Sequence, residues 1–446
     1  MIATDPTTAK NGRSTPDADQ FRLWLATKLE ASLPKNVVPD RDPKTIQLIK
    51  ERFQLGIQHA KFQIPAGDEE MFFAALLDEI LGFGPLEPLL NDDTITEIMI
   101  NGPRQVYVEQ KGKVQLSDVT FVDDAHIERI INKIIKPLGR RIDRNTPTVD
   151  ARLPDGSRVN AVIPPCAIDG PVVTIRKFSR TPLGIDDLIK FGSLNEDMAE
   201  FLKACVVSKL NIVVSGGTGS GKTTLLNVLS GFIPDGERII TIEDAAELSL
   251  NQQHVVRLET KKPARAEDTE VTVRDLVINS LRMRPERIVV GECRGGEALD
   301  MLQAMNTGHD GSLTTLHANS PRDAISRLET LVLMSGMELP LSVVRKQITA
   351  AVDLIVQQAR LRDGSRKIIS ITEVAGMEGD MVVMQEIFKF QEHGEQNGKV
   401  VGEFLPGGMR PQCEERLRIY GFKLPARMFM QTTSRAGVTG RLHQWT

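Results

Sequence analysis

A glycine-rich segment near the middle of the chain carries the clearest chemical signal. Three aliphatic residues, 212–214, precede it, and an apolar stretch with helical spacing follows it. Glycines let the backbone turn tightly enough for several N–H groups to converge on a phosphate at the start of a helix. In this pattern the lysine contacts the β- and γ-phosphates and the hydroxyl residue binds Mg²⁺. The segment predicts a nucleotide site made by Gly216, Gly217, Thr218, Gly219, Ser220, Gly221, Lys222, Thr223 and Thr224.

Two acidic residues follow further aliphatic runs. Glu243 directly follows the run 239–242, and Glu292 follows the run 288–290 after one glycine. Because the carboxyl ends of neighbouring parallel strands meet at one edge of a sheet, both carboxylates are expected near the phosphates. There they can orient the attacking water and hold the metal. The simpler alternative is that each carboxylate only caps its following loop, but two such residues at equivalent strand ends favour the catalytic interpretation.

Two histidines flank another short strand, 312–316. An imidazole beside the γ-phosphate can donate a hydrogen bond to it and report its presence. His309 and His317 are therefore candidates for nucleotide contact. A lone histidine is more often a structural hydrogen-bonding residue, so the chemistry of the side chain alone leaves both interpretations of His309 open.

The elements that must position these residues alternate between strands and helices over about 191–430. The aliphatic runs are short and continuous, as in parallel strands buried on both faces. Residues 46–181 combine helical periodicity with short strands and turn signals, which predicts a smaller α+β domain. We expect a linker at 182–190, a disordered or helical tail at 1–45 and a flexible tail at 431–446. The predicted fold is an α/β nucleotide-binding domain preceded by this α+β domain.

The composition is that of a soluble globular protein, with 41% hydrophobic and 26% charged residues. A net charge of -4 gives no general reason to expect direct contact with nucleic acid. The four cysteines lie far apart without a Cys-x-x-Cys pair, which argues against a disulfide framework and a cysteine zinc site and suits a reducing cytoplasm. No apolar run approaches the roughly 18 residues of a membrane span, so we expect membrane contact only through partners.

Four motifs occur in an order that resembles the secretion-superfamily ATPases of type II and type IV secretion and type IV pili. They are the glycine-rich loop and the segments 241–248, 287–292 and 307–320. The segments 149–165 and 294–305 are similar to the CpaF-type ATPases of tight-adherence (Flp) pili. The similarity covers about 76–429. It implies a homohexameric ring of two-domain subunits, with ATP held between the N-terminal domain and a RecA-like motor domain.

The resemblance also implies roles for single residues. Glu243 becomes the residue that orients water, and His317 becomes the sensor of the histidine motif. Glu292 becomes an atypical Walker B acid that contacts Mg²⁺ through water, beside the direct ligand Thr223. The cofactors implied are ATP and Mg²⁺.

Two arginines of the N-terminal domain, Arg158 and Arg176, match residues that clamp phosphates in this superfamily. A guanidinium group offers fixed bidentate donors to phosphate. Without the resemblance, surface arginines on strands would be the simpler interpretation. Cys293 departs from the family pattern, in which a small apolar residue is expected, and we interpret it as a buried, inert thiol.

The function implied by the resemblance is a cytoplasmic ATPase, peripheral at the inner-membrane face, that assembles or also retracts a Flp pilus through an inner-membrane platform protein. A motor for type IV secretion or conjugation carries the same motifs and stays an alternative. A nucleotide-gated scaffold ring with little hydrolysis is an alternative of another class. The intact acidic and histidine motifs count against that scaffold.

Overall fold

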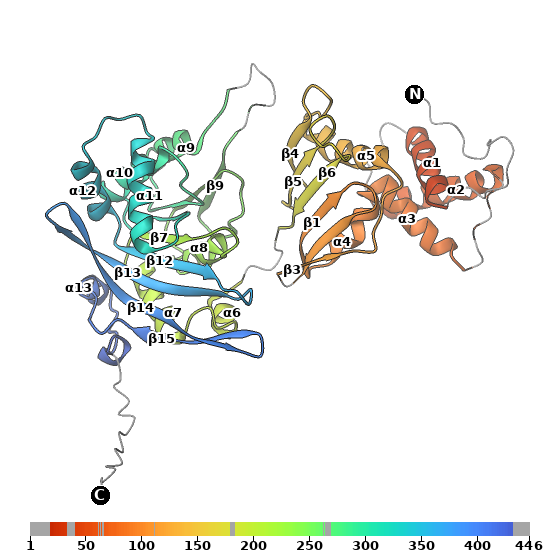
Figure 1. Cartoon of the computed structure of the whole chain (residues 1–446). Coiled ribbons are helices and arrows are strands. Elements are labelled where there is room, and N and C mark those ends of the chain that lie inside the picture. The colour runs from red at the N-terminus through yellow and green to blue at the C-terminus, as the bar shows by residue number, and fades with distance from the viewer. Residues whose placement is uncertain are drawn as a thin grey trace, which may run out of the picture. The chain divides into compact units, whose positions relative to one another are not determined.

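The computed structural model describes residues 18–33, 41–60, 62, 64, 67–110, 112–178, 183–261, 263 and 269–430 (Figure 1). The chain divides into two compact units, Met1–Arg180 and Thr181–Thr446, and each is described by itself. The predicted tail at 431–446 and the first 17 residues of the tail at 1–45 lie outside the described residues. Among the helices of the described ranges, none has both the length and the apolar character needed to span a membrane.

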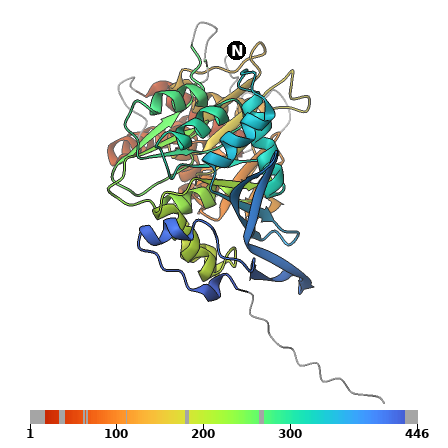
Figure 2. The same ribbon diagram turned by 90° about the vertical axis from the view of Figure 1, so that its left-hand side faces the viewer.

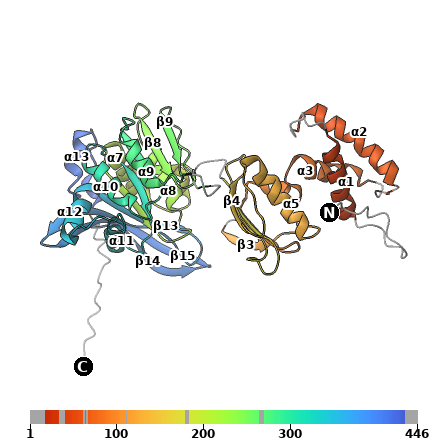
Figure 3. The ribbon, with the colours of Figure 1, turned by 90° about the horizontal axis from the view of Figure 1, so that it is seen from above.

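Three helices open the first unit: α1 (Ala18–Ser32), α2 (Pro43–Ala60) and α3 (Glu69–Leu81) (Figure 3). Their apolar faces share one core, in which Phe21, Phe53 and Phe72 are almost fully buried. Burial of each such side chain stabilises the fold by about 2 kcal/mol. From residue 18 onward, much of the stretch assigned to an N-terminal tail is therefore part of a packed helical bundle.

An antiparallel sheet with the strand order β3-β2-β1-β6-β5-β4 completes the first unit. Helix α5 covers one face of the sheet through its buried isoleucines, among them Ile127, Ile131 and Ile134. Strands β4 and β5 form a hairpin that turns at residues 153–157. The elements are η2 (Gly84–Leu86), α4 (Glu87–Asn91), β1 (Ile95–Asn101), β2 (Val106–Gln110), β3 (Lys113–Leu116), α5 (Asp124–Ile135), η3 (Lys136–Leu138), β4 (Thr148–Arg152), β5 (Arg158–Val162) and β6 (Val172–Arg176).

The second unit is built on a nine-stranded sheet with the order β15-β14-β13-β12-β7-β11-β10-β8-β9. Strands β12, β7, β11, β10, β8 and β9 run parallel. Its elements up to β11 are α6 (Ile185–Lys190), α7 (Glu196–Val207), β7 (Ile212–Gly216), α8 (Lys222–Ser230), β8 (Ile239–Glu243), β9 (Val255–Glu259), α9 (Val273–Ser280), β10 (Arg287–Val290), α10 (Glu297–Asn306) and β11 (Leu313–Leu316).

The antiparallel part of this sheet follows in the chain as long hairpins, drawn in blue in Figure 2. The remaining elements are α11 (Pro321–Leu333), α12 (Leu341–Ala351), β12 (Leu354–Arg360), β13 (Arg366–Glu378), β14 (Met381–Gln396), β15 (Lys399–Pro406), α13 (Glu414–Ile419) and η4 (Ala426–Met428).

Helices cover both faces of the parallel strands, which explains their continuous apolar runs. Residues on one face, such as Ile212 and Val214, pack against α7 and α8. Val213 and Ile240, on the other face, pack against α10, α11 and α12. The predicted α/β architecture with a smaller α+β domain before it is confirmed. The predicted linker at 182–190 is too long, however, because α6 occupies Ile185–Lys190 and buries Leu188 in the core of the second unit.

Candidate nucleotide site

The glycine-rich loop joins the central strand β7 to helix α8, as predicted. Gly219 and Gly221 have φ angles of 71° and 96°, a region that residues with a Cβ rarely adopt. Gly216 is needed for another reason, because a Cβ there would lie 2.3 Å from the carbonyl oxygen of Gln358 on β12. The backbone N–H groups at the start of α8 are therefore held in a glycine-dependent turn of the kind that binds phosphate.

Lys222 is the first residue of α8, and only 8% of its surface is exposed. Its Nζ donates a hydrogen bond to the Gly217 carbonyl oxygen at 3.1 Å and lies 3.4 Å from each ring nitrogen of His317. Burial lowers the pKa of the ammonium group. The lysine is thus folded back over the loop in which phosphate would be bound.

His317 and Glu292 meet at the carboxyl ends of β11 and β10. The His317 Nε2 lies 2.8 Å from the Glu292 Oε1, and the Arg294 guanidinium lies 2.6 Å from the Oε2. These side chains line a hollow of about 390 Å³ that is bordered by Thr218, Glu292, Cys293, Arg294, His317 and Arg327. The structure therefore brings together Lys222, Glu292 and His317, three of the predicted residues.

Arg294 and Arg327 were not among the residues selected from the sequence. Both line the hollow, and Arg294 also approaches Asp244 to 3.7 Å. With Lys222 they add positive charge where a triphosphate would need neutralisation. Because Arg294 follows Glu292 by two positions, its place in the site could have been predicted from the sequence. Arg327 lies within α11, and no local pattern marks it.

Glu243 ends β8 and anchors the loop that follows. Its Oε1 accepts hydrogen bonds from the backbone N–H groups of Glu247 and Leu248 at 2.8 and 3.0 Å. Its Oε2 is buried and has no hydrogen-bond partner within the described part of the chain. Burial raises the pKa of this carboxyl group. One carboxylate oxygen of Glu243 therefore caps the following loop, while its second oxygen has no donor among the described residues. Glu243 is not among the residues that line the hollow beside Lys222.

His309 lies outside the sheet, in the connection between α10 and β11. It precedes β11, its carbonyl oxygen accepts a hydrogen bond from the Ser312 hydroxyl, and its N–H donates to the Ala304 carbonyl oxygen. Strand β11 runs from this turn towards His317, parallel to β7. His309 therefore lies at the amino ends of the strands, whereas the glycine-rich loop lies at their carboxyl ends. The predicted contact between His309 and nucleotide bound at the loop of its own chain is therefore not supported.

Arg158 and Arg176 belong to the first unit. They are directly opposite each other on the antiparallel strands β5 and β6, so both side chains are on the same face of that sheet. Arg176 also lies 3.8 Å from Glu97 on β1. The two arginines form a local pair, and their role in clamping phosphate stays a prediction.

The electrostatic surroundings of His317 lead to a titration prediction. Burial, and next the charge of Lys222, lower the pKa of this histidine, whereas Glu292 raises it. The ring is therefore neutral at pH 7 and takes up its proton only below the ordinary value of about 6.5. We expect Lys222→Met to raise this pKa and Glu292→Gln to lower it further, measured by NMR titration of the ring. Unchanged values in both variants would contradict the contacts described here.

Cys293 borders the same hollow as Glu292 and His317. Cys293 is 2% exposed, and burial raises the pKa of its thiol to about 12, so it stays protonated at neutral pH.

Within the described residues no three His, Cys, Asp or Glu side chains gather as metal ligands. The Thr223 hydroxyl and the Glu292 carboxylate are oxygen donors, which suit Mg²⁺ bound mainly through phosphates and water. These two residues would hold the ion, which supplies charge neutralisation when bound.

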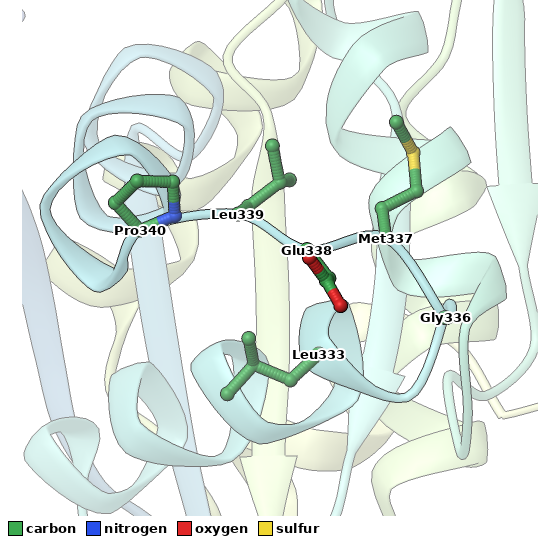
Figure 4. Close-up of a pocket in the computed structure, with 6 residues that line it drawn as sticks. All are labelled: Leu333, Gly336, Met337, Glu338, Leu339 and Pro340. Atoms are coloured by element: carbon green, nitrogen blue, oxygen red, sulfur yellow. The ribbon is translucent and has the colours of Figure 1, made fainter.

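A second hollow, of about 490 Å³, lies in the α11–α12 connection (Figure 4). Its lining is mostly apolar, and Glu338 is its only ionisable side chain; the other residues are Leu333, Gly336, Met337, Leu339 and Pro340. It therefore has no cationic side chain that could bind phosphate and no second ionisable group beside Glu338.

This chain is similar to known proteins over most of its length. The family model described as "Type II/IV secretion system protein" matches residues 79–397. A putative conjugal transfer protein of Mycobacterium tuberculosis is 36% identical over 70% of this chain and 91% of its own length. The type IV secretion system protein VirB11 of Brucella suis is 34% identical over 64% of this chain and 87% of its own length.

A solved structure also matches. The crystal structure of the VirB11 ATPase from the Brucella suis type IV secretion system, in complex with sulphate, is 34% identical with a TM-score of 0.36, and the match covers 64% of this chain and 91% of that one. The family model itself spans most of the two units, including the glycine-rich loop and both acidic strand ends. The chain belongs to the Type II/IV secretion system ATPase family.

Proposed function

We propose that this ATPase forms a homohexameric ring that powers assembly of a Flp (tight-adherence) pilus through an inner-membrane platform protein. The observation that carries the motor function is the joint placement of Lys222, His317 and Glu292 at the carboxyl ends of neighbouring elements of one sheet. The residue proposed to sense the γ-phosphate, His317, is thus in contact with Lys222, the residue proposed to bind that phosphate. The similarity of 149–165 and 294–305 to CpaF-type ATPases supports the pilus as the machine that is driven.

The N-terminal unit supplies the second half of the proposed motor. Arg158 and Arg176 are paired on one sheet face, and guanidinium groups bind phosphate through fixed donors. We propose that these arginines clamp ATP and that closure of the unit on ATP drives the mechanical step. The ring would act on the cytoplasmic face of the inner membrane, with membrane contact through its partner.

The proposal is tested in the source organism by deleting the gene and counting surface pili. Complementation with the wild-type gene should restore them, and complementation with a Glu292→Gln variant should not. Normal piliation in the deletion strain, together with loss of DNA or protein transfer, would contradict the pilus assignment.

A type IV secretion or conjugation motor is the second candidate function. It is favoured by the names of the relatives, a putative conjugal transfer protein and VirB11, which share 36% and 34% of aligned residues with this chain. The same deletion strain separates the two machines when transfer is measured beside piliation.

The ring itself leads to a prediction about a basic stretch after α5, which contains Lys136, Arg140, Arg141 and Arg144. Arg140 donates to the Asp150 carbonyl oxygen, whereas 80% of the Arg141 side chain is exposed, 3.6 Å from Asp143. If Arg141 meets acidic groups of a neighbouring subunit, Arg141→Glu should shift the hexamer towards smaller species, and added salt should weaken the wild-type ring. Light scattering at matched concentration measures this, with exposed Lys113→Glu as the control. An unchanged hexamer would assign Arg141 to a solvated face.

A further inference from the structure

The glycine-rich loop is in contact with the β12–β13 hairpin through Gly219 and Gly221. Arg366, the first residue of β13, donates from Nε to the Gly219 carbonyl oxygen at 2.9 Å. Its Cδ is 3.1 Å from the position that a Cβ of Gly221 would occupy. Within the described part of the chain, the other guanidinium nitrogens of Arg366 have no hydrogen bond or ion pair, and the side chain is exposed. The group is thus held at the loop by one nitrogen and is open on its remaining edges.

Two further polar residues of the same hairpin face the loop. Arg360 is directly opposite Arg366 across the two strands, and its guanidinium is 3.8 Å from the Cβ position of Gly219. Gln358 is 3% exposed, and its amide nitrogen is 3.3 Å from the Cβ position of Gly221. The Gln358 Oε1 is buried without a hydrogen-bond partner among the described residues. A buried polar atom without a partner is costly, which points to a polar ligand or water at this place.

The strand order decides which end of a nucleotide lies here. Glu292 and His317 follow β10 and β11, so the γ-phosphate end is on that side of β7. Strand β12 is on the other side of β7. A nucleotide whose phosphates fill the loop must therefore direct its sugar and base away from β11, towards the β12–β13 hairpin.

We propose that Arg366 contacts the nucleoside part of the bound nucleotide, with its guanidinium plane against the purine base and its open nitrogens donating to the ribose. Arginine both stacks on flat π-systems and donates in the plane of the guanidinium, so it can bind both groups at once. Arg360 adds positive charge to the same wall. This inference rests on the assignment of the loop as the ATP site.

The test is the affinity of the full-length Arg366→Ala variant for ATP, ADP and inorganic tripolyphosphate, measured by competition against a fluorescent nucleotide. We expect affinity for ATP and ADP to fall equally, by about tenfold. Affinity for tripolyphosphate, which has no nucleoside, should stay unchanged. Arg366→Lys keeps the charge but loses the planar group, and it should give an intermediate loss.

Each other outcome overturns the proposal in a different way. A parallel loss for tripolyphosphate would show that Arg366 only braces the loop, and a loss confined to ATP would show a γ-phosphate contact. No loss would exclude a role in binding. Arg362→Ala is the matched control, because Arg362 lies on the same turn but pairs with Glu392 and Glu395. A wild-type protein that binds neither nucleotide would instead contradict the ATP site itself.

Discussion

Replacement of Lys222 by alanine is expected to reduce ATP hydrolysis on the order of a thousandfold, because alanine places no positive charge between the β- and γ-phosphates. Lys222 is almost buried and contacts both the loop carbonyl of Gly217 and the His317 ring. Its loss therefore removes the link between phosphate binding and the γ-phosphate sensor as well as a charge. Phosphate release by the purified protein at saturating ATP measures the effect.

Lys203→Ala is a suitable control, because Lys203 is an exposed lysine on α7 of the same unit. It should hydrolyse ATP at the wild-type rate. Thermal unfolding of both variants separates a catalytic loss from a folding defect. If Lys222→Ala folds and retains near-wild-type turnover, the loop is not the site of hydrolysis.

Glu292→Gln is expected to retain ATP binding and to slow hydrolysis about a hundredfold. The amide has nearly the same shape but loses the negative charge that lies 2.8 Å from His317 and 2.6 Å from Arg294. Without that charge, the Arg294 guanidinium loses its ionic partner, the neutral His317 ring loses a carboxylate neighbour, and the proposed water-mediated contact to Mg²⁺ is weakened. Equilibrium binding of a fluorescent nucleotide, measured beside single-turnover hydrolysis, resolves the two effects.

Glu243→Gln tests the neighbouring strand end in the same assays. The amide oxygen can still accept from the Glu247 and Leu248 N–H groups, so the loop should stay folded. If the second oxygen orients water, hydrolysis should also fall on the order of a hundredfold. Normal hydrolysis would leave Glu243 as a loop anchor only and make Glu247 the next residue to test.

Local sequence was sufficient for those parts of the site that depend on local geometry. The turn after β7 needs glycines at 219 and 221, where φ is positive, and this need is visible in the chain itself. The acidic strand ends were predictable because parallel strands place their carboxyl ends at one edge. The prediction for His309 was wrong for the same reason. His309 comes before β11 and not after it, so it lies at the amino ends of the parallel strands.

Contacts between distant segments were not predictable in this way. Arg366 is 147 positions from Gly219, whose carbonyl oxygen it contacts, and no local sequence pattern indicates this contact. The packing of residues 18–33, within the stretch predicted as a disordered or helical tail, was not predictable, because α1 has little overall hydrophobicity although Phe21 and Leu25 are buried. Such helices are stabilised by tertiary packing more than by their own propensity.

The central place of β7 has a consequence for the chain as it leaves the ribosome. The strand that ends in the glycine-rich loop pairs with β11 on one side and with β12 on the other, and both are made about 100 residues or more later. Gly216 is packed against the backbone of Gln358, so the loop cannot take its final shape until that strand has been synthesised. Pairing of strands so distant in sequence is slow. A nascent chain arrested before β12 therefore exposes an unfinished phosphate loop, and ATP binding is acquired only after β12 has been synthesised.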